Sequence, residues 1–329
     1  MSYHHLSYFD RCEIQFFRNK ARMSIRDIAK EIGRSPSTVS RELRRNSGFR
    51  GRYDALQAQV RASARQQLGN RSKCLDYPPL RAFVVEQLRQ KWSPEQISGR
   101  LQQLYPTDEQ MRVSYETIYQ FVYADKTSGG DLYKHLRQAH RKRRRRTGKR
   151  GLRGTIRNRV SIEERPAIVE RKERCGDWEG DTVFGKGHTH PIATFTERKT
   201  QFLTGATMPD KKATSLNDAA QRAFANIPDA PIHTLAVDNG KEFAAHEELA
   251  GTLKTDIYFA RPYTATDRGL NESINGLLRQ YLPKGACFKN LTDKHLNRII
   301  DKLNNRPRKK LGYRTPKEAF FNLTVALKT

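Results

Sequence analysis

Strand-like and helix-like segments follow one another in a fixed order through the C-terminal half of the chain. Short apolar runs typical of strands occur at 177–185, 190–198, 200–208, 232–240 and 256–262. Amphipathic patterns typical of helices occur at 214–227, 241–253 and 268–282. The sequence therefore predicts three consecutive strands, followed by a helix, a strand, a helix, a strand and a helix.

This order is that of a ribonuclease-H-like α/β domain, and three acids fall at informative places within it. Asp181 lies in the first strand, Asp238 ends the fourth, and Glu272 lies in the first turn of the last helix. The turn dipeptide Asn239-Gly240 presents Asp238 at the C-terminal end of its strand, where α/β sheets commonly place chemistry. Asp238 and Glu272 are separated by 33 residues. We expect the three carboxylates to converge at one edge of the sheet.

Three clustered carboxylates repel one another, so a cation must offset their charge. Hard oxygen ligands favour Mg²⁺ or Mn²⁺. Two such ions, about 3.5–4 Å apart, activate a water or a 3′-hydroxyl and stabilise the leaving oxygen during attack on a phosphodiester. We therefore predict that Asp181, Asp238 and Glu272 are both the catalytic and the metal-binding residues, with two ions present when DNA is bound.

Other acids compete for the first of these roles. Asp177 and Glu179 share a strand face with Asp181, which we prefer because it lies furthest into the apolar run. Glu197 is interpreted as a surface residue at a strand end. Trp178 either stacks on a base or packs under the sheet, and packing is the preferred interpretation.

The charge balance indicates a polyanionic partner. Lys and Arg number 62 against 35 Asp and Glu, a formal net charge of +27. Residues 1–160 hold 35 of these cations and 14 of the acids, so most of the excess lies there. Nucleic acid fits this charge better than an anionic membrane, because no apolar run approaches the roughly 18 residues of a membrane span and no signal peptide is recognised. The four cysteines lack paired spacing, which is typical of reduced thiols in a cytosolic protein.

Residues 23–46 have the pattern of a helix-turn-helix. Apolar residues at helical spacing end at Gly33, and Ser35 with Pro36 then forms the cap and first position of a second helix. Short hydroxyls and arginines at the start of that helix suit base-edge and phosphate contacts in a major groove. The DNA-binding residues predicted here are Arg34, Ser37, Thr38, Ser40, Arg41, Arg44 and Arg45. The alternative is an ordinary surface helix with a basic face.

A second pair of short helices is predicted further along. Ser93 and Gln96 form a capping box for one, and Ser114 caps the other, leaving Tyr115 and Thr117 near its exposed start. This unit either reads DNA or serves only packing or dimer contacts. Residues 141–159 then carry 11 Lys/Arg and no acid, so we expect a tether along phosphates that includes Arg143, Arg144, Arg145 and Arg146.

These features predict a multi-domain chain. The expected order is an N-terminal helix-turn-helix domain (1–66), a second helical domain (67–140), a basic linker (141–164) and the catalytic domain with a helical tail (165–329). Around the catalytic acids, we expect Lys241, Asn275, Arg279 and Lys284 to hold DNA phosphates. We expect the partner to be double-stranded DNA.

Several motifs together resemble one known family. The segments "WEGDTVFGKG", "TERKT", "VDNGKEF", "RGLNESINGLLRQYLPKG" and "NNRPRKKLGYRTPKEAF" resemble the catalytic domain of the IS-thirty family of bacterial insertion-sequence transposases. "IRDIAKEIGRSPSTVSREL" resembles its N-terminal helix-turn-helix, and the similarity spans nearly the whole chain. The resemblance implies a retroviral-integrase-like catalytic domain, and it implies that the protein acts in the bacterial cytoplasm, associated with the nucleoid.

The same resemblance implies an activity. Asp181, Asp238 and Glu272 would form an Asp-Asp-Glu triad, whose second spacing matches that of the family. The protein would bind the terminal inverted repeats of its element, cleave strands to expose 3′-hydroxyls and transfer them to target DNA. A homodimer or larger assembly is expected, because two ends must be paired. The alternatives are a nuclease that uses water alone and a DNA-binding regulator with a decayed catalytic domain.

Overall fold

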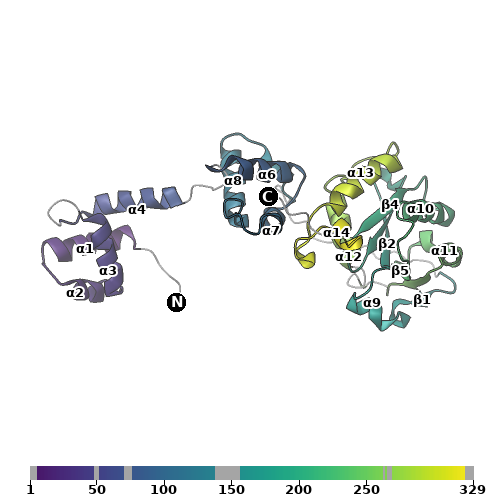
Figure 1. Cartoon of the computed structure of the whole chain (residues 1–329), viewed down its shortest axis with the longest axis horizontal. Coiled ribbons are helices and arrows are strands. Elements are labelled where there is room, and N and C mark those ends of the chain that lie inside the picture. Colours follow the sequence, from purple (N-terminus) through teal and green to yellow (C-terminus); the bar gives the residue numbers. More distant parts are fainter. Residues whose placement is uncertain are drawn as a thin grey trace. The chain divides into compact units, whose positions relative to one another are not determined.

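The computed structural model describes residues 6–47, 52–69, 76–137, 156–261, 264 and 269–322. Contacts divide the chain into two compact units, Met1–Leu75 and Asp76–Thr329 (Figure 1). The four-domain division expected from the sequence stays a prediction. The arginines of the basic tether, Arg143, Arg144, Arg145 and Arg146, lie outside the described residues. In the described part of the chain, no helix is long and apolar enough to cross a membrane.

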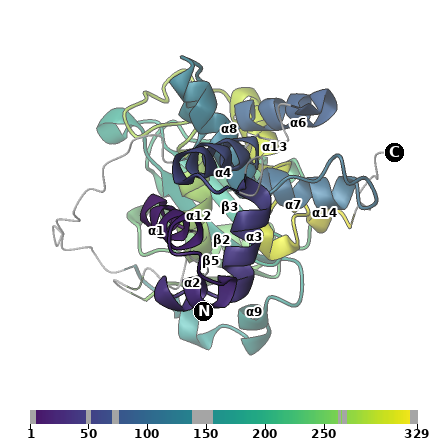
Figure 2. The same cartoon turned by 90° about the vertical axis from the view of Figure 1, so that its left-hand side faces the viewer.

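The first unit is a helical domain built around the predicted helix-turn-helix (Figure 2). Its helices are α1 (Tyr8–Asn19), α2 (Ile25–Glu31), α3 (Pro36–Asn46) and α4 (Ala55–Gly69). Gly33 has a φ of +65°, which stops α2, and the Ser35 hydroxyl accepts a hydrogen bond from the Thr38 amide at 3.3 Å. The predicted turn and cap are confirmed. Helix α1 was not predicted.

A buried ion pair ties three of these helices together. Arg11 of α1 donates from Nε to Glu42 of α3 at 2.9 Å, and both side chains are less than 10% exposed. Glu42 also accepts from the Tyr53 hydroxyl at 2.9 Å, and Arg11 donates to Gln59 of α4 at 2.8 Å. The charges of this pair are thus satisfied within the core, which is the condition for burying them.

The described residues of the second unit that precede the sheet include three helices and a short 3-10 turn. These are α6 (Pro78–Arg89), α7 (Pro94–Leu104), α8 (Tyr115–Thr127) and η2 (Leu132–His135). The capping box of Ser93 and Gln96 and the Ser114 cap are both present, as predicted. Helix α6 was not predicted.

A six-stranded mixed sheet follows in the order β1-β6-β5-β2-β3-β4. The strands are β1 (Val160–Ser161), β2 (Asp177–Val183), β3 (Ile192–Glu197), β4 (Leu203–Thr207), β5 (Thr234–Val237) and β6 (Asp256–Phe259). The helices between and after them are α9 (Ala167–Arg171), α10 (Ala213–Ala225), α11 (His246–Leu253), α12 (Gly269–Leu278), α13 (Asp293–Asn304) and α14 (Pro316–Phe320). Strands β2, β3 and β4 are antiparallel neighbours, whereas β5 and β6 run parallel to β2. The predicted order of strands and helices is confirmed.

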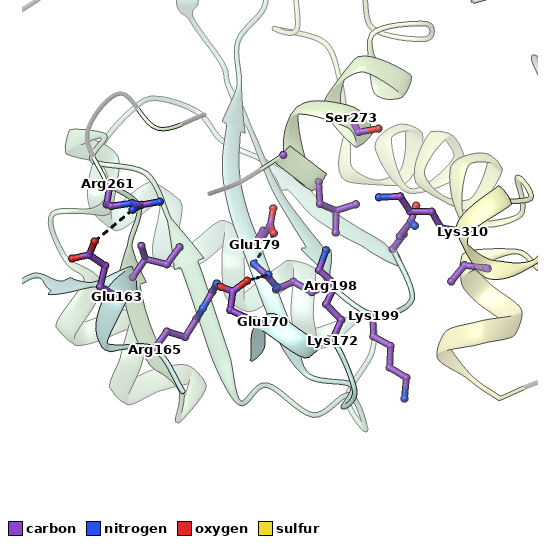
Figure 3. A pocket seen from close by; sticks show the side chains of 15 residues that line it. Glu163, Arg165, Glu170, Lys172, Glu179, Arg198, Lys199, Arg261, Ser273 and Lys310 are labelled. Atoms are coloured by element: carbon purple, nitrogen blue, oxygen red, sulfur yellow. Dashed lines mark hydrogen bonds and ion pairs between the residues drawn. The ribbon is translucent and has the colours of Figure 1, made fainter. Parts of the chain in front are cut away.

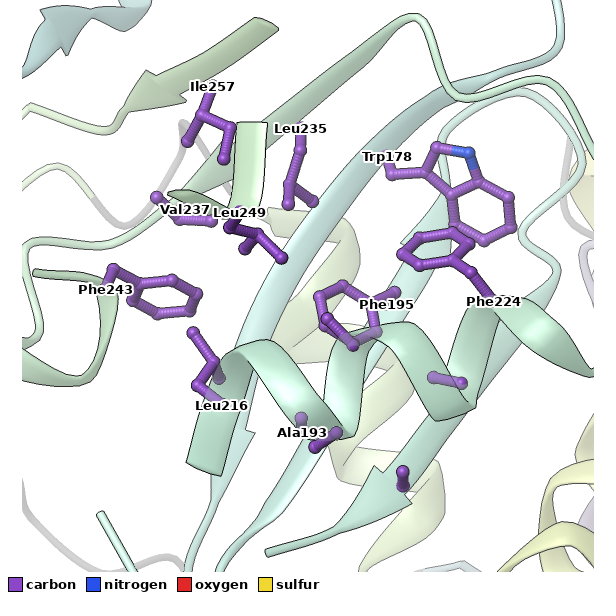
Figure 4. Close-up of a cluster of buried hydrophobic side chains, with 14 of the residues drawn as sticks. Trp178, Ala193, Phe195, Leu216, Phe224, Leu235, Val237, Phe243, Leu249 and Ile257 are labelled. Atoms are coloured by element: carbon purple, nitrogen blue, oxygen red, sulfur yellow. The ribbon is translucent and has the colours of Figure 1, made fainter. Parts of the chain in front are cut away.

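The sheet separates two apolar cores. One lies against α10 and α11 and includes Trp178, which is fully buried and contacts the Phe224 ring edge-on (Figure 4). Its indole nitrogen donates to the Pro231 carbonyl at 3.0 Å, so Trp178 packs under the sheet, as the sequence favoured. The other core joins β2 to β4 with α12 and α13 and includes Ile274 and Leu278.

Three details differ from the sequence interpretation. Strand β1 pairs in parallel with β6, although residues 141–164 were expected to form a linker. The helix expected at 241–253 is divided into a 3-10 turn, η5 (Lys241–Phe243), and α11. Glu197 is fully buried, not on the surface, because its carboxylate accepts hydrogen bonds from the Thr200 amide and hydroxyl, each at 2.6 Å.

Candidate active site

Two of the three predicted acids lie near the C-terminal ends of neighbouring parallel strands, Asp181 within β2 and Asp238 directly after β5. The register of β2 and β5 pairs Glu179 with Ala236. Because the two strands are parallel, Asp181 and Asp238, each two residues further along, lie opposite each other. Side chains alternate along a strand, so Asp181 lies on the opposite face from Trp178. Both Asp181 and Asp238 are half-buried. The structure thus brings these two carboxylates to one end of the sheet.

The turn after β5 holds Asp238 in place. Its carboxylate accepts a hydrogen bond from the Gly240 amide at 2.9 Å, which is an Asx-turn. A Cβ built on Gly240 would lie 2.8 Å from Asp238 Oδ1 and 2.6 Å from the carboxylate of Glu242. Glu242 therefore lies beside Asp238, and it accepts from the Thr182 hydroxyl at 2.6 Å. Glu242 falls within the helix expected at 241–253, and its position directly after the turn is the sequence signal for a place beside Asp238.

The third acid lies on α12, which packs against β2 through its apolar side. Asn275 of α12 donates from Nδ2 to Asp181 Oδ2 at 2.7 Å. Glu272 precedes Asn275 by three residues, so the two lie on the same side of the helix. The Glu272 side chain is exposed. Within the described ranges, no group of three or more His, Cys, Asp or Glu side chains is placed to hold a metal ion.

The rival acids on β2 are engaged by arginines. Arg174 pairs with Asp177 through two hydrogen bonds of 3.0 and 2.9 Å. Arg198 donates to Glu179 at 3.0 Å, and the Asn271 amide at the start of α12 donates to the same carboxylate at 3.2 Å. Burial nevertheless raises the pKa of Glu179, because desolvation outweighs the attraction of Arg198. Asp177 and Glu179 are almost fully buried, and both are paired with arginines. Asp181 is therefore the preferred candidate for a catalytic acid on β2, and it is also the acid nearest the end of that strand.

The residues predicted to support catalysis have different surroundings. Lys241 and Lys284 are exposed, whereas Asn275 is engaged with Asp181. Arg279 donates to the Phe184 carbonyl at 2.8 Å, and burial lowers its pKa. Arg279 thus stabilises the loop after β2, whereas the sequence predicted only a contact with DNA phosphates.

The predicted DNA-reading helix presents most of its polar residues to solvent. Ser37, Ser40, Arg41, Arg44 and Arg45 of α3 are exposed, and Thr38 is half-buried. Val39 and Leu43 are buried in the core of the unit, so the opposite side of α3 forms a basic surface. Arg34 precedes the helix and pairs with Asp10 of α1 at 3.2 Å.

In the second helical unit, α8 carries the two predicted residues. The Tyr115 side chain is 53% exposed at the start of the helix. The Thr117 hydroxyl lies 2.8 Å from that of its cap residue, Ser114. Ile118, Phe121 and Val122 are buried, as the sequence pattern predicted.

Two family models match the chain at these two regions. A helix-turn-helix domain model matches residues 2–46, and an integrase core domain model matches residues 172–265. The transposase of insertion sequence element IS4351 from Bacteroides fragilis is 44% identical over 91% of this chain and 90% of its own. The chain belongs to the IS30 family of transposases. The motifs had indicated the same family.

Other members show a similar extent of likeness. The InsI transposase of element IS30A from Escherichia coli (strain K12) is 40% identical over 95% of this chain and 82% of its own. The transposase of element IS1086 from Cupriavidus metallidurans is 36% identical over 95% of this chain and 93% of its own. This IS30-family chain is therefore a transposase with a helix-turn-helix for DNA binding and a ribonuclease-H-like integrase core, of the polynucleotidyl transferase class. The integrase core implies that the activity depends on a divalent metal.

Proposed function

We propose that this transposase binds the terminal inverted repeats of its insertion sequence, cleaves their strands and joins the 3′-hydroxyls to target DNA through Asp181, Asp238 and Glu272. The proposal rests on the way in which β2, β5 and α12 meet. The register of β2 and β5 brings Asp181 opposite Asp238, and the hydrogen bond from Asn275 ties Asp181 to the helix that bears Glu272. The family membership supplies the class of reaction.

The donor chemistry of these residues fits magnesium or manganese. Carboxylate oxygens are the ligands that these hard ions prefer, and Asn275 fixes the orientation of one of them. A pair of such ions supplies an activated water or 3′-hydroxyl and charge stabilisation at the leaving oxygen. Asp181 and Asp238 are the inner ligands in this proposal, and the exposed Glu272 side chain completes the set when DNA is bound.

The N-terminal unit selects the DNA. Exposed hydroxyls and arginines on α3 suit base edges and phosphates of a major groove. Because transposition requires two element ends in one complex, we propose that at least two copies of the chain assemble on paired ends. The reaction then takes place on DNA in the bacterial cytoplasm.

The test is an incubation of the full chain with Mg²⁺, donor DNA carrying candidate inverted repeats, and a target plasmid. We expect joined donor–target products from the wild type. Nicked DNA without joined products would instead identify a nuclease, and binding without any cleavage would identify a regulator.

A substitution in the triad separates chemistry from binding. We expect Asp238→Asn to abolish cleavage and joining while leaving the affinity for inverted-repeat DNA unchanged. The matched control is Asp229→Asn in the loop after α10. Cleavage by Asp238→Asn at the wild-type rate would remove Asp238 from the mechanism.

A further inference from the structure

A large cavity lies beside the candidate active site but contains none of its three acids. Its volume is about 960 Å³, and its lining residues come from the start of α12, the segments around α9 and η7 (Lys309–Leu311), strand β2 and the turn that follows β3 (Figure 3). Gly269, Leu270 and Ser273 of α12 line one wall. Ser273 directly follows Glu272 in the chain, so a strand held at the triad has this cavity as its neighbour.

The lining of the cavity has a surplus of positive charge. Its six cationic side chains are Arg165, Lys172, Arg198, Lys199, Arg261 and Lys310. Among the described residues that line the cavity, three are acids, namely Glu163, Glu170 and Glu179. If all of these described groups are ionised, the six cations exceed the three acids by three charges.

The cations are crowded enough to affect one another. Burial, and then repulsion by Arg198, lowers the pKa of Lys172, with smaller contributions from Lys310 and Arg165. Mutual repulsion of this kind costs free energy in the empty pocket, and an anion bound there would relieve it.

Arg198 contributes a buried guanidinium to the lining of the cavity. Its side chain is only 5% exposed, and it pairs with Glu179 at 3.0 Å and Glu170 at 3.3 Å. Its Nε atom is buried, and among the described residues it has no hydrogen-bond partner. The two glutamates thus leave one donor of this guanidinium unsatisfied among the described residues, so they offset its charge only in part.

We propose that this pocket binds a phosphate-bearing, unpaired nucleotide of the DNA strand that extends past the triad. The phosphate lies among Lys172, Arg198 and Lys310, and the apolar side chains of Leu270 and Leu311 provide a wall for the sugar or base. A volume of about 960 Å³ is of the size that holds single small ligands, and it is too small for a double helix. The inference rests on the proposed function, because it assigns the pocket to the strand held at the proposed triad.

The test compares two labelled duplexes that differ only in a short unpaired thymidine extension. Binding of the full-length chain is measured by fluorescence anisotropy over a range of salt concentrations, in EDTA so that no cleavage takes place. We expect the extended duplex to bind more tightly than the blunt one. Its plot of log K against log salt should be steeper by about 0.7 for each single-strand phosphate held.

The variant that removes the pocket charge is Lys172→Asn combined with Lys310→Ala. Asparagine is chosen because residue 172 has a φ of +56°, which asparagine adopts readily. We expect the variant to lose both the tighter binding and the steeper slope of the extended duplex, with its affinity for the blunt duplex unchanged. The matched control, Lys289→Ala with Lys294→Ala, removes the same charge from exposed positions and should keep both.

Two outcomes would overturn the inference. One is an extended duplex that binds no better than the blunt one in the wild type. The other is a pocket variant that weakens both duplexes equally, as a general loss of charge would. Because the assay requires neither metal nor cleavage, these failures are distinguishable from failure of the proposed transposition chemistry.

Discussion

The acids of β2 differ in what they contact, and this difference separates structure from chemistry. Asp177 and Glu179 are buried against arginines, whereas Asp181 accepts a hydrogen bond from the neutral amide of Asn275. Removing a buried partner of an ion pair leaves an uncompensated charge, so the first two acids are fixed in place. Asn275 orients a carboxylate without neutralising it, which is the usual role of a residue behind a metal ligand.

The contact of Asn275 predicts a positioning role. We expect Asn275→Ala to lower the cleavage rate by roughly 10- to 100-fold, because Asp181 loses the hydrogen bond that orients it. Inverted-repeat affinity should be unchanged, and the dependence of the rate on Mg²⁺ concentration should shift to higher concentrations. The control is Asn226→Ala at the exposed end of α10. A Mg²⁺ dependence equal to that of the wild type would contradict the role.

The buried pair of Arg11 and Glu42 is expected to stabilise the N-terminal unit. Glu42→Ala leaves the Arg11 charge buried without its carboxylate, so we expect the unit to lose about 3–5 kcal/mol of stability. Calorimetry of the full chain should register this as a lower first transition. Arg34→Ala, which breaks a more exposed pair, should cost only about 0–1 kcal/mol. An equal loss of stability in the two variants would contradict the claim that the buried pair is the main contact between α1 and α3.

At the scale of elements, the C-terminal segment joins α7 to the catalytic domain. Arg306 donates to Gln96 of α7 at 2.7 Å and to Gln280, just after α12, at 2.6 Å. Arg100 of α7 pairs with Glu318 of α14. These contacts connect the second helical unit to the helix that bears Glu272.

The pair of Arg100 and Glu318 predicts a pH effect. Burial raises the pKa of Glu318, but hydrogen bonds from Arg100 and Thr315 outweigh burial, so the pKa is lowered overall. A lowered folded-state pKa means that the stabilisation is present above the ordinary value of 4.5 and is lost as the pH falls through the folded value. We expect protease cleavage between α14 and the rest of the unit to increase in this acid range. Glu318→Gln should already be cleaved by the protease at neutral pH. Resistance to the protease equal to that of the wild type would contradict a stabilising role for the Arg100–Glu318 pair.

The elements that the sequence predicted are those with local signals. Ser35-Pro36, Ser93 and Ser114 mark helix starts through caps, and these signals require no knowledge of distant residues. Helix α1 carried such a signal in the Ser7–Asp10 capping box, which was overlooked. Strand β1 has only two residues and exists through its pairing with β6, about a hundred residues away, so no local pattern specifies it.

Local sequence signals likewise predict only part of the candidate active site. The strand ends that place Asp181 and Asp238 together follow from the element order, and the register is consistent with that expectation. The burial of Glu197 and the partners of Glu179 depend on contacts between separate elements, which alternation along one strand does not contain. Whether Glu272 joins the two aspartates stays a prediction.

At the scale of the whole molecule, the net charge of +27 predicts strongly salt-dependent DNA binding. Removing one side chain that binds a phosphate should lower the slope of log K against log salt by about one. We expect Arg44→Ala with Arg45→Ala to reduce the slope by about two, because both arginines are exposed on α3. Lys289→Ala with Lys294→Ala is the charge-matched control. An equal reduction of the slope in both double variants would mean that only total charge matters.

The most direct test of the account is the binding of Mn²⁺ to the full chain on inverted-repeat DNA, followed by electron paramagnetic resonance. We expect the wild type to bind two ions, and Asp181→Asn, Asp238→Asn and Glu272→Gln each to weaken this binding, while Asp218→Asn on the exposed side of α10 does not. Unchanged Mn²⁺ binding in any of the three triad variants would contradict the claim that these carboxylates share one metal site.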